Sequence, residues 1–285
     1  MADKIYPCIW FDGKGKEAAE FYCSIFENSC VKTVTGTVVI FQLCGKKFMG
    51  LNGGPVFKPN PSVSFFVKCN SIEQTDNTWN KLTEGGSALM PLDNYPWSER
   101  YGWANDKYGV SWQIMLDPQS NGRQTISPAM LFTNDMLGRA EEAIRFYTGI
   151  FPGSGTGLMA RYPDGDTYAG KLMYAEYNLF GFDMIAMDGP GDHHFIFNEG
   201  VSFVVDCKDQ EEVDYYWTKL TGEGGQESMC AWLKDKFGVS WQIVPSKLGE
   251  LIGSPEKEKA GRAIQAMLKM KKIIITDLQK AFDGN

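Results

Sequence analysis

An internal repeat constrains the fold of this chain more than any other feature of its sequence. The segment KYGVSWQIM, which starts at Lys107, returns almost unchanged as KFGVSWQIV, which starts at Lys236. Three further pairs occur in the same order in both halves: EAAEFYCSIF with EAIRFYTGIF, VSFFVKC with VSFVVDC, and WNKLTEGG with WTKLTGEGG. These segments persist while the lengths between them change, which is typical of a duplicated domain with divergent loops. A unit of this size is a domain in its own right and not a solenoid repeat.

Each copy shows the same predicted order of elements. It opens on a short apolar strand, IYPCIWF or ISPAMLF, with proline near the start, where a missing ladder donor does least harm. An amphipathic helix and three strand-like runs follow, and the buried strand VSFFV or VSFVV then leads into a second helix. The segment GVSWQI is the last strand of each copy. The sequence therefore predicts an α+β fold, a tandem duplication of four βαβββ modules followed by C-terminal helices.

The domain boundaries that we predict follow from the repeat. The first domain is residues 1–118, a polar and turn-rich linker spans 119–125, and the second domain is residues 126–246. Residues 247–285 form a helical tail that has no counterpart in the first half. Its main helix is expected to have Ser254 as N-cap and an apolar stripe of Ile264, Met267 and Leu268. The tail either packs across the domains or offers a helix to a partner.

Composition excludes some classes of function. The net charge of −7 repels phosphate backbones, so nucleic acid is not an expected partner. No apolar run approaches a membrane span, and the opening MADKIYPCIWFDGKG lacks the apolar stretch of a signal peptide. The seven cysteines include no C-x-x-C pair, which is typical of reduced thiols and not of a zinc site. We therefore expect a cytoplasmic protein that does not contact a membrane.

Several segments resemble the PhnB-like branch of the vicinal oxygen chelate superfamily, which includes glyoxalase I, extradiol dioxygenases and bleomycin-resistance proteins. They are WFDGKGKEAAEFYCSIF, LNGGP, DGPGDHHFIFNEGVSF, WTKLTGEGG, WLKDKFGVSWQIVP and AIQAMLKMKKI. The resemblance implies paired βαβββ modules that curl around a small-molecule cavity. This branch is often labelled 3-demethylubiquinone-9 3-methyltransferase. Because the chain has no glycine-rich strand-to-helix turn that would seat S-adenosylmethionine, we do not expect methyl transfer.

The same resemblance implies a metal site of two histidines and two carboxylates, one from each of four strands. The corresponding positions in the two copies are near Tyr6 and Ser127, Gly50 and Ala186, Ser62 and Gly200, and Gln113 and Gln242. None of them is a carboxylate or an imidazole, and a neutral amide is a much poorer ligand for a divalent metal. We therefore expect no catalytic metal and no other cofactor.

Four polar residues are candidates for a functional site. Gln113 and Gln242, which alternate with apolar neighbours on their strands, either contact a ligand in a cavity or bridge backbone groups inside the fold. Glu176, in LMYAEYNLF, is either a buried general base with a raised pKa or an outward residue of a half-exposed strand. His194, in DGPGDHHFIFNEG, is either an acid–base group or a loop histidine that holds backbone groups. Any catalysis is expected in the second copy, which contains both Glu176 and His194.

Aromatic residues are candidates for a pocket around a flat ligand, although repeated tryptophans more often mark repeated core packing. The candidates are Trp10, Trp103, Trp232 and Tyr174. Three functions stay open: metal-independent binding of a small organic molecule, an enzyme that uses Glu176 and His194, and a sequestering protein similar to bleomycin-resistance proteins. Whether the chain is an enzyme is undecided. Since the resemblance implies one-domain relatives that form dimers with shared sites, we expect a pseudo-dimeric monomer or a homodimer.

Overall fold

The computed structural model describes residues 4–119 and 123–285. The chain forms two compact units: a larger unit of residues 6–201, and a smaller unit of residues 202–285 with Lys4 and Ile5. Each βαβββ module that the repeat predicts is present, so the predicted α+β fold is confirmed. The linker predicted at 119–125 includes residues 120–122, which lie outside the described residues.

The first module forms a sheet in the order β1-β4-β3-β2. Strand β1 runs parallel to β4, and the other neighbours are antiparallel. Helix α1 packs on this sheet through its buried face, which includes Ala18, Ala19 and Tyr22. The bounds are β1 (Ile5–Phe11), α1 (Gly15–Ile25), β2 (Cys30–Val34), β3 (Val38–Leu43) and β4 (Lys46–Asn52).

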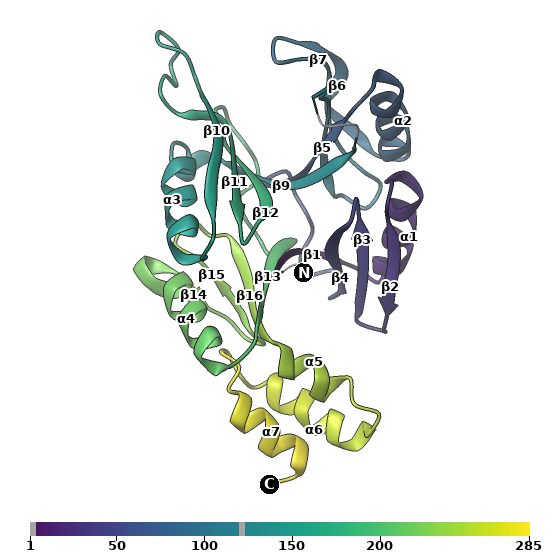
Figure 1. The fold of residues 1–285 in the computed structure, drawn as a ribbon, viewed down its shortest axis with the longest axis vertical. Helices are drawn as coiled ribbons and strands as arrows, with labels where there is room; N and C mark the ends of the chain where they lie inside the picture. Colours follow the sequence, from purple (N-terminus) through teal and green to yellow (C-terminus); the bar gives the residue numbers. More distant parts are fainter. Residues whose placement is uncertain (1–3, 120–122) are drawn as a thin grey trace. The chain divides into compact units, whose positions relative to one another are not determined.

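An eight-stranded sheet in the larger unit combines strands from both copies, in the order β10-β11-β12-β9-β5-β8-β7-β6. The copies meet where β5 and β9 run antiparallel, with Ser64 opposite Ala129. Helices α2 and α3 lie on the outer sides of these strands (Figure 1). From the first copy come β5 (Val63–Cys69), α2 (Ile72–Thr83), β6 (Ser87–Tyr95), β7 (Ser98–Asn105) and β8 (Ser111–Leu116). From the second copy come β9 (Thr125–Phe132), η1 (Asn134–Met136), α3 (Ala140–Ile150), β10 (Gly155–Arg161), β11 (Leu172–Leu179) and β12 (Phe182–Asp188).

Alternation of side chains gives this sheet two chemically different faces. On β8, Trp112 and Ile114 are fully buried on the helix side, where the Trp112 ring lies 5.1 Å from that of Tyr22 in α1. Gln113 and Met115 point to the opposite side, as the sequence predicts. We call that side the inner face. It carries Ser64, Phe66, Lys68, Tyr101, Trp103, Gln113, Met115, Ala129, Tyr174, Glu176, Ile185 and Met187.

The smaller unit contains the last module, whose sheet has the order β14-β15-β16-β13. Strand β13 runs parallel to β16, and α4 packs on β15 and β16. The bounds are β13 (Val201–Cys207), α4 (Gln210–Thr221), η2 (Gly222–Gly224), β14 (Gln226–Glu227), β15 (Trp232–Lys234) and β16 (Ser240–Pro245). The β14–β15 hairpin is much shorter than its counterpart β6–β7, in agreement with the shorter segment between WTKLTGEGG and KFGVSWQIV in the second copy.

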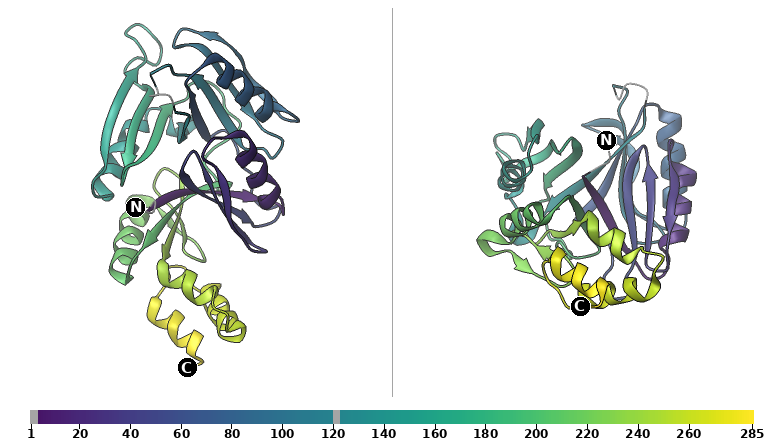
Figure 2. Two further views of the ribbon diagram at one scale, coloured as in Figure 1. Left: turned by 45° about the vertical axis from the view of Figure 1, so that its right-hand side comes forward. Right: turned by 60° about the horizontal axis from the view of Figure 1, so that its bottom comes forward.

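The C-terminal tail forms three helices that pack against one another in the smaller unit, drawn in yellow-green and yellow in Figure 2. Their buried side chains join Ala231 in one apolar cluster. The backbone N–H groups of Cys230 and Ala231 donate to the carbonyls of Met270 and Lys271, at 2.7 and 2.9 Å. The short β14 does not reach Cys230 and Ala231, so their backbone N–H groups find acceptors in the tail and not in a neighbouring strand. The helices are α5 (Ser246–Ile252), α6 (Lys257–Met267) and α7 (Ile275–Asp283).

Two details of the tail differ from the sequence-based expectation. Helix α6 begins at Lys257 with Glu256 as N-cap, so Ser254 is not the cap; its hydroxyl accepts from the Glu256 N–H in the preceding turn. The expected apolar stripe is correct only in part. Met267 packs against the tail cluster, but Leu268 is 48 % exposed and the buried residues of α6 are Ala260 and Ala263. Small alanines let the helix approach its neighbours closely, so the larger apolar residues lie at the edge of the contact. In the described part of the chain, no helix combines the length and the apolar character needed to cross a membrane.

Candidate functional site

Aromatic and methionine side chains gather on the inner face of the eight-stranded sheet. Phe66, Tyr101, Ala129 and Ile185 form a buried cluster there. Partly buried side chains surround it: Met90, Tyr95, Trp103, Met115, Tyr174 and Met187. Such half-buried aromatic and thioether groups offer contact area to a flat apolar ligand and adapt to its shape.

Gln113 lies beside this cluster and is only 3 % exposed. Its Nε2 donates to Ser64 Oγ at 2.8 Å, and its Oε1 accepts from the Tyr101 hydroxyl at 2.7 Å. The amide thus bridges side chains of β5 and β7, and not backbone groups as one of the two expectations had it. One N–H and one lone pair of the amide remain for a further contact. Burial raises the pKa of Tyr101, which keeps its hydroxyl a donor.

Glu176 lies on the same face and forms an ion pair with Lys68 from the first copy. Lys68 Nζ lies 2.5 Å from Glu176 Oε1 and 3.7 Å from Asp117 Oδ2, and the Tyr174 hydroxyl donates to the same Oε1 at 2.8 Å. Burial by itself would raise the pKa of Glu176, but the hydrogen bonds from Lys68 and Tyr174 outweigh it and lower the pKa. Of the two alternatives for Glu176, the buried general base with a raised pKa is therefore contradicted.

The two tryptophan candidates of the larger unit have different surroundings. Trp103 belongs to the inner face, and its indole N–H donates to Ser111 Oγ at 2.8 Å. Trp10 is on β1, where its indole N–H donates to the Gly54 carbonyl at 2.7 Å and its ring meets Phe57 edge-on. The fold thus brings Trp103, and not Trp10, into the cluster with Gln113.

Gln242 and Trp232 belong to the smaller unit. They lie opposite each other on β16 and β15, and Gln242 Nε2 donates to Ser202 Oγ at 3.0 Å. This bond repeats the contact between Gln113 and Ser64. The counterpart of Tyr101 in the repeat is Cys230, so the second glutamine has no tyrosine at the matching sequence position.

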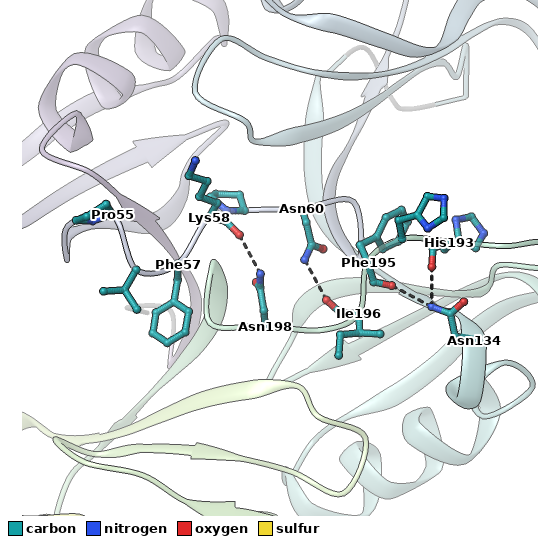
Figure 3. Close-up of a pocket in the computed structure, with 12 residues that line it drawn as sticks. Pro55, Phe57, Lys58, Asn60, Asn134, His193, Phe195, Ile196 and Asn198 are labelled. Atoms are coloured by element: carbon teal, nitrogen blue, oxygen red, sulfur yellow. Dashed lines mark hydrogen bonds between the residues drawn. The ribbon is translucent and has the colours of Figure 1, made fainter.

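His194 lies in the connector 189–200, outside the inner face. It is exposed and lines a shallow pocket of about 550 Å³ between this connector and residues 53–62. Figure 3 shows this pocket with its labelled residues from both connectors, among them Lys58, Asn60 and Asn198. Reciprocal hydrogen bonds join the two connectors: Asn60 Nδ2 donates to the Ile196 carbonyl and Asn198 Nδ2 to the Lys58 carbonyl, both at 3.0 Å. Among the residues described, no hydrogen bond, ion pair or shared pocket connects His194 with Glu176.

The inner face does not have the donor set of a divalent metal site. The expected ligand positions in this sheet are near Ser62, Gln113, Ser127 and Ala186, and Ala186 is buried on the helix side between the inner-face residues Ile185 and Met187. The Gln113 oxygen already accepts from Tyr101. Within residues 4–119 and 123–285, no group of three or more His, Cys, Asp or Glu side chains is arranged to hold a metal ion. The residues present do not fit the superfamily's metal.

Sequence reasoning missed the partners of the site residues. Ser64, Tyr101 and Lys68 hold Gln113 and Glu176 in place, yet nothing in their local sequence marks them. A comparison of the two copies could have indicated Lys68 as a site residue. The strands VSFFVKC and VSFVVDC differ only at Phe66 and Lys68, and both positions lie on the inner face. Where two copies diverge on one face of a conserved strand, that face is a good place to look for a site present in one copy only.

Four βαβββ modules, two of which share one eight-stranded sheet with an aromatic inner face, give the chain the fold of a glyoxalase-like protein of the vicinal oxygen chelate superfamily. The chain belongs to the family described as 3-demethylubiquinone-9 3-methyltransferase, whose two matches cover residues 3–115 and 124–244. The two matches follow the repeat, and the helical tail lies beyond them.

Two solved structures are similar to parts of this chain. A PhnB protein from Bacillus cereus is 37% identical over 40% of this chain and 100% of that chain, with a TM-score of 0.39. Glyoxalase I from Zea mays is 10% identical over 83% of this chain and 89% of that chain, with a TM-score of 0.52, and therefore shows the fold alone. No curated protein matches the chain.

Proposed function

We propose that the chain binds a small, flat organic molecule against the inner face of the eight-stranded sheet, without a catalytic metal. The observation that carries this proposal is the cluster of half-buried aromatic side chains beside the Gln113 amide. Ligand sites are commonly concave and lined by apolar side chains with a few well-placed polar groups, and the inner face has that mixture of side chains. The amide would orient the ligand, and the partly buried Trp103 and Tyr174 would cover its flat surfaces.

The differences between the copies support the inner face of this sheet over the strands around Gln242. The sequence counterparts of Phe66, Tyr101 and Glu176 are Val204, Cys230 and Ile40. The aromatic rings and the carboxylate are thus features of one set of strands. The residues that we propose for binding are Gln113, Trp103 and Tyr174. Trp10, Trp232 and Gln242 remain predictions of ligand-binding residues.

A thermal-shift screen against divalent metal ions and a broad set of metabolites, with EDTA controls, tests this proposal. A ligand that prefers the folded state raises the melting temperature, so an organic compound is expected to do so and metal ions are not. Gln113→Met should abolish the shift, whereas the matched Gln242→Met should retain it. A stoichiometric divalent metal in the purified protein, or a shift lost only in Gln242→Met, would contradict the proposal.

Catalysis on the same face is a second candidate function. The observation that favours it is the contact between the Tyr174 hydroxyl and the Glu176 carboxylate, because such a pair can accept and relay a proton. Glu176→Gln should then abolish turnover of a compound that binds. His194→Ala tests the sequence-based role of His194, which has no contact with this pair. Binding without any product would favour a sequestering protein.

The other expectations from the sequence remain predictions. These are a cytoplasmic location and a pseudo-dimeric monomer or homodimer. The methyltransferase activity in the family description is not part of our proposal. The connection from β1 to α1, GKGKEA, has the glycine spacing of a cofactor-binding turn, contrary to the expectation from the sequence, but α1 leads into the antiparallel pair β2 and β3 and not into the parallel βαβ sheet that such a turn serves.

A further inference from the structure

One oxygen of the Glu176 carboxylate has no hydrogen-bond donor among the residues described. Both Lys68 Nζ and the Tyr174 hydroxyl contact Oε1, which leaves Oε2 open. The Glu176 side chain is 36 % exposed, so a ligand on the inner face can reach it. Its contact with Lys68 keeps the carboxylate charged at neutral pH. The inner face therefore offers an open anionic acceptor at the edge of its aromatic cluster.

The charges around Glu176 leave this edge negative. Lys68 is the ammonium group between two carboxylates, Glu176 and Asp117, so these three groups sum to one negative charge. The next carboxylate, Asp183, has its own partner, since Lys46 Nζ lies 2.7 Å from it. A ligand that placed a carboxylate or phosphate here would face repulsion, and one that placed an ammonium would be attracted.

The rings beside Glu176 favour the same kind of ligand. The centroid of Phe66 lies 5.7 Å from that of Tyr174 and 6.3 Å from that of Tyr101. The faces of such rings carry a negative quadrupole and attract cations, most strongly where water is excluded. An ammonium that reached Glu176 Oε2 would pass along this group of rings.

A second open acceptor lies elsewhere on the same side of the sheet. Asn105 follows Trp103 by two residues on β7, and its Oδ1 is buried without a hydrogen-bond partner among the described residues. A buried acceptor without a partner is costly, and a donor from a ligand would remove that cost. Glu176 Oε2 and Asn105 Oδ1 would therefore both suit a ligand that donates hydrogen bonds.

We propose that the ligand of the inner face is a flat aromatic amine whose ammonium group donates to Glu176 Oε2, and not an aromatic acid. This inference rests on the proposed function, because it names the class of ligand for the same face. The repeat counterparts of Glu176 and Lys68 are Ile40 and Asp206, so the preference belongs to this face and not to both copies.

Three probes with one ring system separate the possibilities: tryptamine, its neutral alcohol tryptophol, and indole-3-acetate. Isothermal titration of the full chain at pH 7 should give the tightest binding for tryptamine and the weakest for indole-3-acetate. One charge-assisted hydrogen bond corresponds to about tenfold in affinity between tryptamine and tryptophol. Equal or tighter binding of indole-3-acetate would overturn the amine preference while leaving the proposed function intact.

Substitution of the carboxylate tests the assigned contact. Glu176→Gln keeps the shape of the side chain and the hydrogen bond from Tyr174. It should lower the affinity for tryptamine about tenfold and leave the affinity for tryptophol unchanged. Glu250→Gln is the matched control, because Glu250 forms an exposed ion pair with Lys247 at 3.0 Å in the smaller unit. If Glu176→Gln and Glu250→Gln both leave tryptamine binding unchanged, the contact is refuted. If none of the probes binds, the amine inference falls, and the broad screen decides the proposed function separately.

Discussion

At the scale of single residues, a buried aspartate explains the nine-residue repeat. Asp106 precedes KYGVSWQIM; its Oδ1 accepts from the backbone N–H groups of Tyr108 and Val110, and its Oδ2 accepts from the Trp112 indole and the Tyr22 hydroxyl. Asp235 precedes the second copy and makes the matching bonds to Phe237, Val239 and Trp241. The repeated segment is thus a turn and a buried tryptophan held by one carboxylate.

Asp106→Asn should destabilise the chain, because the amide group would turn a donor toward the Trp112 N–H. One buried donor then loses its acceptor, which costs about 1–3 kcal/mol. Urea unfolding followed by tryptophan fluorescence measures this change, with the exposed Asp192→Asn as control. Equal unfolding midpoints for the two variants would contradict the assigned role of Asp106.

The Glu176 ion pair should contribute stability that depends on pH. Because the folded pKa of Glu176 is lowered from 4.5, the contribution is present above that pH and is lost as the pH falls through the folded pKa. The free energy of unfolding of Glu176→Gln should therefore be lower than that of the parent chain at neutral pH. We call this difference the stability gap, and it should close as the pH falls. In a Lys68→Met background the gap should be small at every pH. A gap of constant size would show that the ion pair does not cause it.

At the scale of elements, the tail shows how packing overrides a periodic pattern. A stripe of Ile264, Met267 and Leu268 predicts the apolar face of α6, yet the buried face contains Ala260 and Ala263. Apolar periodicity identifies a helix reliably, but the neighbouring elements decide which of its side chains are buried. Helix α7 contributes Leu278, which is fully buried in the tail cluster.

Leu278→Ala and Leu268→Ala make a matched pair for the tail. The first removes buried methyl groups and should cost about 2–5 kcal/mol. The second acts at a side chain that is 48 % exposed and should change stability by less than about 0.5 kcal/mol. Urea unfolding measures the free energy of unfolding of both variants. A larger loss for Leu268→Ala than for Leu278→Ala would show that Leu268 is the covered residue and would contradict this packing.

At the scale of the whole molecule, the duplicated copies share strands. The eight-stranded sheet takes β5–β8 from the first copy and β9–β12 from the second, joined along β5 and β9. Gln113 and Glu176, which are 63 residues apart in the sequence (176 − 113), therefore lie on one face. His194 belongs to the same copy as Glu176, but the connector that contains it lies outside that face.

A fragment of residues 1–118 should form a homodimer. In the full chain β5 pairs with β9, whose sequence ISPAMLF matches IYPCIWF of β1, so a second copy of the fragment can supply the missing partner strand. Size-exclusion chromatography with light scattering measures the mass. A folded monomer of the fragment would contradict the expectation that each copy needs strands from another.

The sequence by itself determined the repeat, the order of elements in each module, the α+β class and the alternation that puts Gln113 and Trp112 on opposite faces. These follow from local patterns, because side-chain periodicity and turn residues act over a few positions. Only the tertiary structure decided that Lys68 lowers the pKa of Glu176, that Tyr101 and Ser64 hold Gln113, and that His194 lies elsewhere. The physical reason is that Lys68 and Glu176 are separated by 108 residues, and contacts over such a distance depend on which strands pair.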